Sequence, residues 1–252
     1  MFIDTHCHLS NEEYDIDEVI KNANSEDVNI LITGGTNKEN NCSDILLSKK
    51  YKNVYITLGY HPEYASFITK KDLDDLEKQI VENKDKVVGI GEIGLDYHYG
   101  KENKEKQIEL FKKQILLANK YHLPIVVHTR DATFDTINII KELKPTGVIH
   151  CFSGSLEIAK EYINLGFKLG IGGVVTFKNS NLKNIISEIG IDNIVLETDS
   201  PYLSPKRGEK NETSNIKLIF DFLCFLLPLD KNYIKNKLYD NSVKIFKFDK
   251  KN

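Results

Sequence analysis

The chain has 252 residues, of which 40% are hydrophobic and 28% are charged, and its formal net charge is −3. This composition is typical of a globular protein with enough apolar material for a core. The negative charge excludes a broad, sequence-independent coat on duplex nucleic acid, which needs a basic face, but it allows a small site that holds one or two phosphates.

The sequence also indicates the compartment. No apolar stretch approaches the roughly 18 residues of a membrane helix, and the N-terminus lacks the basic and apolar regions of a secretory signal. The cysteines are widely separated and form no CxxC pair, which argues against a zinc ribbon or a redox motif. We therefore expect an intracellular, cytoplasmic protein with no membrane partner and no obligate protein partner.

Short apolar segments recur along the chain, and each is followed by a longer segment with helical character. The apolar segments are continuous rather than alternating, as expected of strands that are buried on both faces. The eight predicted strands cover residues 2–5, 28–33, 54–58, 87–93, 125–128, 148–150, 167–171 and 194–197.

The segments between these strands have the spacing of amphipathic helices. The pattern is clearest in 101–121, where Ile108, Phe111, Ile115 and Ala118 fall on one stripe. Further helices are predicted at 72–83, at 156–165 with Ser155 as N-cap and Gly166 as C-terminal stop, at 215–227, and at 231–246 with a basic outer face.

Eight strand–helix alternations match an α/β fold of the (β/α)8 or TIM-barrel type. No linker, low-complexity block or repeat divides the chain, so we expect one barrel domain over residues 1–252. A doubly wound open sheet is the alternative fold. The motif GIGEIG at 89–94 lies within a predicted strand and opens no helix, so it is weak evidence for dinucleotide binding.

Polar side chains fall where the predicted strands end. His6 and His8 follow the first strand, and in an extended backbone they share a face while Cys7 points away. Positions at the carboxyl ends of the later strands, or shortly beyond them, are held by His61, Glu92, Asp96, His128, His150 and Asp199. Because the carboxyl ends of barrel strands converge on one mouth, we expect these side chains to meet there.

Four histidines and two carboxylates are too many for one tetrahedral zinc ion, but they suit two cations that share a bridging carboxylate. A buried polar network without metal is the structural alternative for part of this set. Zinc or manganese suits mixed nitrogen and oxygen ligands, whereas magnesium would need water to complete its coordination. We predict His6, His8 and Asp199 for one ion, His128 and His150 for the second, and Glu92 as the bridge.

Six motifs resemble, in order, those of the TatD family of metal-dependent deoxyribonucleases, which are amidohydrolase-like hydrolases: FIDTHCHL, GYHP, GEIGLDY, VVHTR, HCFSG and ETDSPYLSP. The resemblance runs from Met1 to about Glu212. It implies a barrel fold and the same metal ligands, namely His6, His8, Glu92, His128, His150 and Asp199.

One segment departs from the family pattern. The stretch LSPKRGEKNETS is shorter than usual before Arg207, and Thr213 stands where a proline is usual, while Gly208, Asn211 and Glu212 are retained. Arg207 is a candidate for binding a substrate phosphate through its guanidinium fork, and an exposed loop residue without function is the alternative.

The predicted reaction is hydrolysis of a DNA phosphodiester by a water that two divalent ions activate, with 3′–5′ exonuclease-like action on the ends of single-stranded or short substrates. Asp199 would ligate an ion and act as general base, and Glu92 would bridge the ions. His61 would bind the phosphate or protonate the leaving oxygen, or merely cap the turn before Pro62. The alternative functions are an ester or amide hydrolase, for example one that acts on an aminoacyl-tRNA end, and a non-catalytic metal-binding module.

Overall fold

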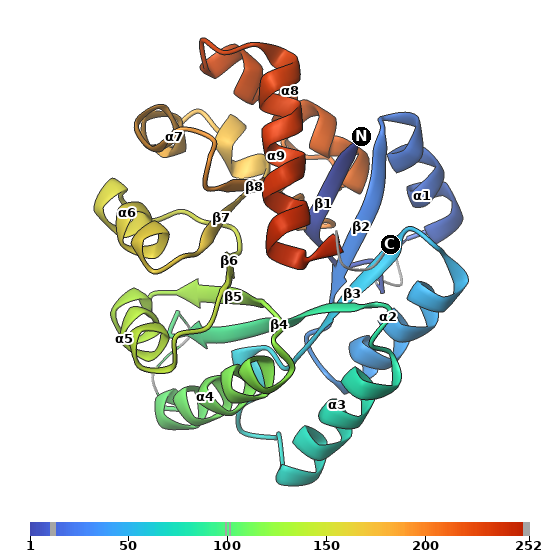
Figure 1. The fold of residues 1–252 in the computed structure, drawn as a ribbon, viewed down its shortest axis with the longest axis vertical. Coiled ribbons are helices and arrows are strands. Elements are labelled where there is room, and N and C mark those ends of the chain that lie inside the picture. Colours follow the sequence, from blue (N-terminus) through green and yellow to red (C-terminus); the bar gives the residue numbers. More distant parts are fainter. Residues whose placement is uncertain (11–13, 99, 101, 249–252) are drawn as a thin grey trace.

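The computed structural model describes residues 1–10, 14–98, 100 and 102–248. Eight parallel strands lie in chain order in one sheet, and helices surround them (Figure 1). The strands are β1 (Phe2–Cys7), β2 (Val28–Gly34), β3 (Val54–Leu58), β4 (Val87–Asp96), β5 (Ile125–Arg130), β6 (Gly147–Ile149), β7 (Lys168–Ile171) and β8 (Ile194–Leu196).

The helices follow the strands in alternation. They are α1 (Ile16–Ser25), α2 (Lys38–Lys50), α3 (Lys70–Glu82), α4 (Lys104–Tyr121), α5 (Thr133–Leu143), α6 (Leu156–Asn164), α7 (Leu182–Ile189), α8 (Ile216–Leu226) and α9 (Lys231–Phe246). Short 3-10 helices lie at η1 (Pro62–Tyr64), η2 (Gly173–Thr176) and η3 (Thr213–Asn215). Within the described part of the chain, no helix has the length and apolar character needed to cross a membrane.

Hydrogen bonds just beyond the end of β8 join it to β1 and bring the sheet round into a barrel. The backbone amides of Thr198 and Asp199 donate to the carbonyl of His6 at 3.3 and 3.0 Å, and the Thr5 hydroxyl donates to the Leu196 carbonyl at 2.8 Å. The buried carboxylate of Asp4 accepts the amide and the hydroxyl of Thr198 at 3.0 and 2.6 Å. The predicted (β/α)8 barrel is confirmed. The hydrogen bonds form a seam between β8 and β1, and this seam holds Asp199 beside the end of β1.

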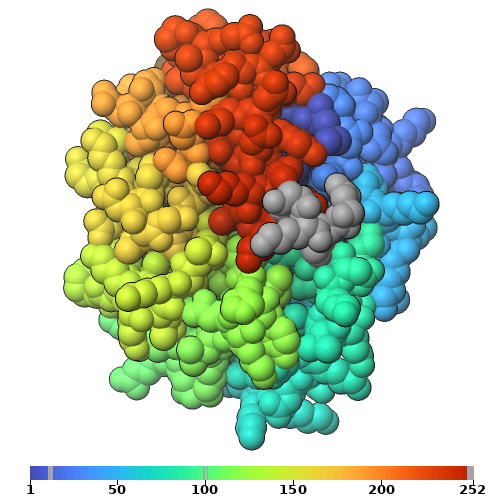
Figure 2. Space-filling view, viewed as in Figure 1, coloured from blue at the N-terminus to red at the C-terminus, as the bar shows by residue number. Residues whose placement is uncertain are grey.

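One end of the barrel is closed by the C-terminal helix. Six strands each contribute one apolar side chain to a buried cluster, against which Phe246 and Phe248 pack. Figure 2 shows α9 in red, lying over the centre of the face that Figure 1 presents. The strand residues of this cluster are Ile3, Ile32, Val88, Val126, Val148 and Val195.

The predicted boundaries agree with the structure to within a few residues. Ser155 caps α6, since its side chain accepts from the Ile158 amide at 3.4 Å, and α9 has the predicted bounds 231–246. The start of the predicted helix at residue 101 lies outside the described residues, and α4 begins at Lys104. The strand β4 extends three residues further than predicted, to Asp96.

Candidate metal centre

The first two histidines of the predicted set lie side by side at the end of β1. Their Nε2 atoms are 3.2 Å apart. The Cys7 side chain points to the opposite face, where its Sγ lies 3.4 Å from the Ile32 carbonyl oxygen. The alternation of an extended strand therefore places both imidazoles on the inner face of the barrel mouth.

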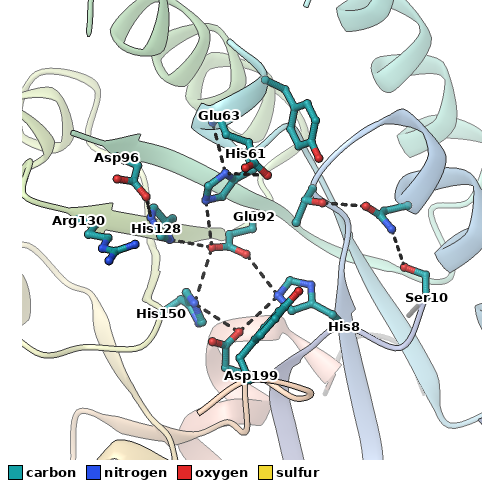
Figure 3. Close-up of a pocket in the computed structure, with 14 residues that line it drawn as sticks. His8, Ser10, His61, Glu63, Glu92, Asp96, His128, Arg130, His150 and Asp199 are labelled. Atoms are coloured by element: carbon teal, nitrogen blue, oxygen red, sulfur yellow. Dashed lines mark hydrogen bonds and ion pairs between the residues drawn. The ribbon is translucent and has the colours of Figure 1, made fainter. Parts of the chain in front are cut away.

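Glu92, from β4, lies between His8 on one side and the imidazoles of His61, His128 and His150 on the other (Figure 3). Its side chain is almost fully buried. The Oε2 atom is 3.4 Å from His6 Nε2 and 3.6 Å from His8 Nε2. The Oε1 atom is 3.0 Å from His128 Nδ1, 3.7 Å from His150 Nε2 and 3.9 Å from His61 Nε2. Each carboxylate oxygen thus faces its own set of nitrogen atoms.

Asp199 completes the group from the seam between β8 and β1. Its Oδ1 atom lies 3.4 Å from His8 Nε2 and 3.7 Å from the Nε2 atoms of His6 and His150. Its backbone has a φ of 56°, in the left-handed region that non-glycine residues seldom adopt. Its carbonyl accepts from the Tyr202 amide at 2.8 Å, so both sides of this turn are held by hydrogen bonds.

These side chains fit divalent cations. Three overlapping groups of side chains each offer donor atoms that lie within 4.8 Å of one another, and these donors are the imidazole nitrogens and carboxylate oxygens that suit zinc or manganese. All six predicted ligands belong to these groups, and the structure adds His61. The groups are His6–His150–Asp199, His6–His8–Glu92 and His61–Glu92–His128.

The imidazoles and carboxylates of this centre shift one another's pKa values. Burial alone would lower the pKa of each imidazole, but neighbouring carboxylates outweigh it and raise the pKa of His8 and His128 to about 9 and that of His150 to about 10. Burial would likewise raise the pKa of Glu92, yet the imidazoles, led by His150, hold it well below its usual range. Because ligands bind metal in their deprotonated form, a cation here must displace these protons.

Three of the imidazoles are oriented through the ring nitrogen that faces away from the centre. His128 Nε2 lies 3.0 Å from Asp96 Oδ2, and His8 Nδ1 lies 3.0 Å from a backbone carbonyl oxygen of β2. His150 Nδ1 lies 3.2 Å from Glu197 Oε1, an ion-pair contact whose angles do not meet hydrogen-bond geometry. Contacts of this kind fix the ring orientation of metal-binding histidines.

Glu197 is a functional candidate that the sequence analysis did not single out. Its side chain is fully buried, and its Oε1 also accepts from the Cys151 amide at 2.5 Å. A Cβ atom at position 170 would lie 2.2 Å from its Oε2, so only Gly170 on β7 leaves room for this carboxylate. The sequence feature that could have indicated a role for Glu197 is its place in the ETDSP motif, two residues before Asp199.

His61 makes contacts through both of its ring nitrogens. Its Nδ1 accepts from the Glu63 amide at 3.3 Å and so caps η1, which is the turn role considered from the sequence. Burial lowers its pKa to about 4, so that the ring is neutral near pH 7. With Nδ1 acting as an acceptor, the proton of the neutral ring lies on Nε2, which faces Glu92.

A cavity of about 560 Å³ opens above the centre. Besides six of the seven donor residues, all but His6, it is lined by Arg130, which was not predicted from the sequence although it ends the VVHTR motif. Arg207 does not line this cavity. It lies in a neighbouring one, so the structure does not bring the predicted phosphate ligand to the metal centre. The remaining lining residues include Ser10, Thr36, Asn40, Glu63, Tyr64, Asp96 and Tyr202.

Comparison with known proteins agrees with this geometry. The family model described as TatD related DNase matches residues 3–247, which is nearly the whole chain. The chain belongs to the TatD family. This membership confirms the predicted class, a metal-dependent hydrolase of the TatD type, and the donor groups at the barrel mouth are consistent with it.

TatD relatives match over almost their full length. A protein of Bacillus subtilis described as the uncharacterised metal-dependent hydrolase YabD is 37% identical over 99% of this chain and 100% of its own. The crystal structure of YjjV, a TatD homologue from Escherichia coli, superposes with a TM-score of 0.92 at 30% identity, covering 98% of each chain. A TatD family hydrolase from Entamoeba histolytica gives a TM-score of 0.89 at 28% identity, covering 97% of each chain.

Proposed function

We propose that this TatD-family hydrolase cleaves phosphodiester bonds at the ends of single-stranded or short DNA, with a 3′–5′ exonuclease-like action that depends on two divalent ions. One observation carries the proposal. The two oxygen atoms of Glu92 face different groups of imidazoles, the arrangement that a carboxylate bridging two ions would need. Two-ion centres are suited to phosphoryl chemistry because they act on both the attacking and the leaving oxygen.

When bound, the ions would polarise a water molecule and the oxygens of the scissile phosphate. Asp199 would accept the proton of that water. Its Oδ1 faces three imidazoles, which leaves Oδ2 as the proton acceptor. His6, His8, His128 and His150 would hold the ions with Glu92 and Asp199.

Two further side chains would hold the substrate. His61 would donate a hydrogen bond from Nε2 to a phosphoryl oxygen, a role that a neutral imidazole can fill. Because its pKa is lowered, His61 is a poor choice for protonating the leaving oxygen. Arg130 lines the same cavity, and its guanidinium would contact the phosphate through two parallel hydrogen bonds.

The net charge of the chain favours a small DNA-binding site over an extended DNA-binding surface. A formal charge of −3 provides little attraction for a long duplex. The cavity of about 560 Å³ is within the usual range for a site that encloses a small ligand. A strand end that enters the mouth therefore fits better than a duplex lying across it.

The test compares cleavage of different substrates by the protein with and without bound metal ions. Single-stranded oligodeoxynucleotides with a label at either end should be shortened from the 3′ end by the metal-loaded protein. Chelation should stop cleavage, and manganese should restore it. The Asp199→Asn variant should fold normally and lose at least about 10²-fold in kcat, the lower end of the contribution of a general base. Hydrolysis of esters or amides, including an aminoacyl-tRNA end, without cleavage of the oligonucleotide would reject the proposal.

A further inference from the structure

A second cavity lies beside the metal cavity on the β7–β8 side of the mouth. Its volume is about 510 Å³. One wall follows β7 and contains Phe177 and Lys178, and the other follows β8 and contains residues 204–209. Since Tyr202 lines the metal cavity and Ser204 lines the second one, only one residue separates the two linings along the chain. We call this second cavity the flanking groove.

The two walls of the flanking groove are in close contact. A Cβ atom at Gly173 would lie 2.2 Å from the Leu203 carbonyl oxygen and 2.9 Å from the Pro205 nitrogen, so the segment after β7 packs directly on the loop after β8. The buried Asn211 holds the end of this loop, because its Nδ2 donates to the carbonyl of Tyr202 at 2.6 Å. The groove therefore has a defined position relative to the metal centre.

The chemistry of the groove suits an anionic chain. Lys178, Lys206 and Arg207 are exposed along it, and one carboxylate, that of Glu209, lies 3.6 Å from the Lys206 ammonium. The groove is thus locally positive although the whole chain is negative. Only two of the 34 basic residues are arginines, and these line the two adjoining cavities: Arg130 the metal cavity and Arg207 the groove.

Two aromatic rings accompany these charges. Phe177 is 38% exposed in the groove, and Tyr202, which lines the adjoining metal cavity, is 58% exposed. Exposed rings beside cations are the features by which proteins bind single-stranded nucleic acid, because unpaired bases stack on the rings while the cations follow the phosphates. A paired duplex does not offer its bases in this way.

We propose that the flanking groove binds the single-stranded segment that adjoins the scissile phosphate. Bases stack on Phe177 and Tyr202, and backbone phosphates contact Lys178 and Arg207. This inference rests on the proposed function, since it extends the substrate from the metal centre. It gives Arg207 a phosphate contact one or more nucleotides away from the reaction.

The test compares a substrate that reaches the groove with one that cannot. For the Phe177→Ala variant we expect kcat/KM on a single-stranded oligodeoxythymidylate to fall roughly 5- to 150-fold, the equivalent of 1–3 kcal/mol of stacking per base. For bis(p-nitrophenyl) phosphate, a small phosphodiester, we expect no change. The matched control is Phe225→Ala, which removes an 86% exposed ring from α8 outside the groove.

A binding measurement keeps the proposal testable if the protein cleaves no DNA. The probe is a fluorescein-labelled phosphorothioate oligodeoxythymidylate of about ten nucleotides, titrated with metal-loaded protein and followed by anisotropy. Phe177→Ala should weaken binding. Arg207→Ala should reduce the slope of log Kd against log salt by about 0.7, the value for one phosphate of a single strand. The control Lys21→Ala, on the exposed surface of α1, should change neither quantity.

The outcomes distinguish the groove from the metal centre. Unchanged binding and cleavage in Phe177→Ala, or equal losses on both substrates, would overturn the groove proposal. Equal competition by polyglutamate would also overturn it, because charge alone would then explain the binding. Failure of the wild-type protein to cleave any phosphodiester, with binding of the labelled probe that Phe177→Ala weakens, would reject the proposed function and leave the groove supported.

Discussion

At the scale of single residues, the contacts behind the metal centre determine how its ligands point. His150 faces Glu92 and Asp199 with Nε2 and faces Glu197 with Nδ1. Glu197 is fully buried against β7, and Gly170 provides the space for it. We therefore infer that Glu197 orients His150 without touching the substrate.

We predict that neutralising Glu197 lowers the affinity of the centre for metal ions. Glu197→Gln keeps the shape of the side chain and removes its charge, so metal binding should weaken by about 10- to 100-fold, as is usual when the partner of a metal-binding histidine is lost. Calorimetric titration with manganese measures this, and excess metal should restore most of the activity. Glu188→Gln, on the exposed surface of α7, is the control.

A purely structural role would give a different result. If Glu197→Gln lowered the melting temperature but bound manganese with unchanged affinity, the orienting role would be wrong. The same would hold if added metal failed to restore any activity.

The residues of the site differ in how far the sequence reveals them. The predicted ligands could be found because strand ends converge in a barrel, which requires only their positions along the chain. Glu197 and Arg130 could not be assigned in this way. The role of each depends on the direction of a long side chain, and for Glu197 that direction depends on the packing of β7 against β8.

At the scale of elements, the β2–α2 unit contains a buried acid outside the metal centre. The Thr33 hydroxyl donates to Asp44 Oδ1 at 3.0 Å and accepts from the Leu9 amide at 3.1 Å. Burial raises the pKa of Asp44 to about 7, despite the opposing hydrogen bond from Thr33. The folded protein therefore keeps a proton on this carboxyl at pH values where the unfolded chain has lost it.

This raised pKa predicts a pH dependence of stability. Between pH 5 and 7.5 the native state binds more protons at this site than the unfolded state does, so the free energy of unfolding falls as pH rises. Relative to Asp44→Asn, which cannot ionise, the wild-type protein should lose about 2 kcal/mol over this range. Urea unfolding of both proteins at each pH measures the difference. If the difference in free energy of unfolding between the two proteins stayed constant with pH, the Asp44 carboxyl would be ionised in the folded protein over the whole range, and the prediction would be wrong.

The same unit shows why some elements were harder to predict. The strands are apolar along their whole length because both faces are buried, so they are visible in the sequence. The helix α2 buries three polar side chains with Ile45, namely Asn41, Asp44 and Ser48, and has no continuous apolar stripe. Its position follows from hydrogen bonds such as that of Asn41 Nδ2 to the Gly59 carbonyl at 3.0 Å, which periodicity does not reveal.

At the scale of the whole molecule, the two ends of the barrel have different functions. The metal centre and the flanking groove lie at the carboxyl ends of the strands, whereas Phe246 and Phe248 close the opposite end. In barrels of this type, catalytic residues lie at the carboxyl ends of the strands, whereas residues at the amino ends contribute to stability. Mutations at the two ends should therefore have separable effects.

The closing helix α9 provides the test. Phe246→Ala removes a fully buried ring and should lower the free energy of unfolding by roughly 3–5 kcal/mol. The kcat of the protein that remains folded should not change. Chemical denaturation and activity measured on the same samples separate these effects. A large loss of kcat in fully folded protein would show that the two ends are coupled.

The most direct test of the account is to locate the metal ions. Crystals of the manganese-loaded protein, measured on both sides of the manganese absorption edge, should give two anomalous peaks in the mouth of the barrel. One should lie on the Oε2 side of Glu92, near His6 and His8, and the other on the Oε1 side, near His128. A single peak, or no peak between these side chains, would contradict the two-ion centre.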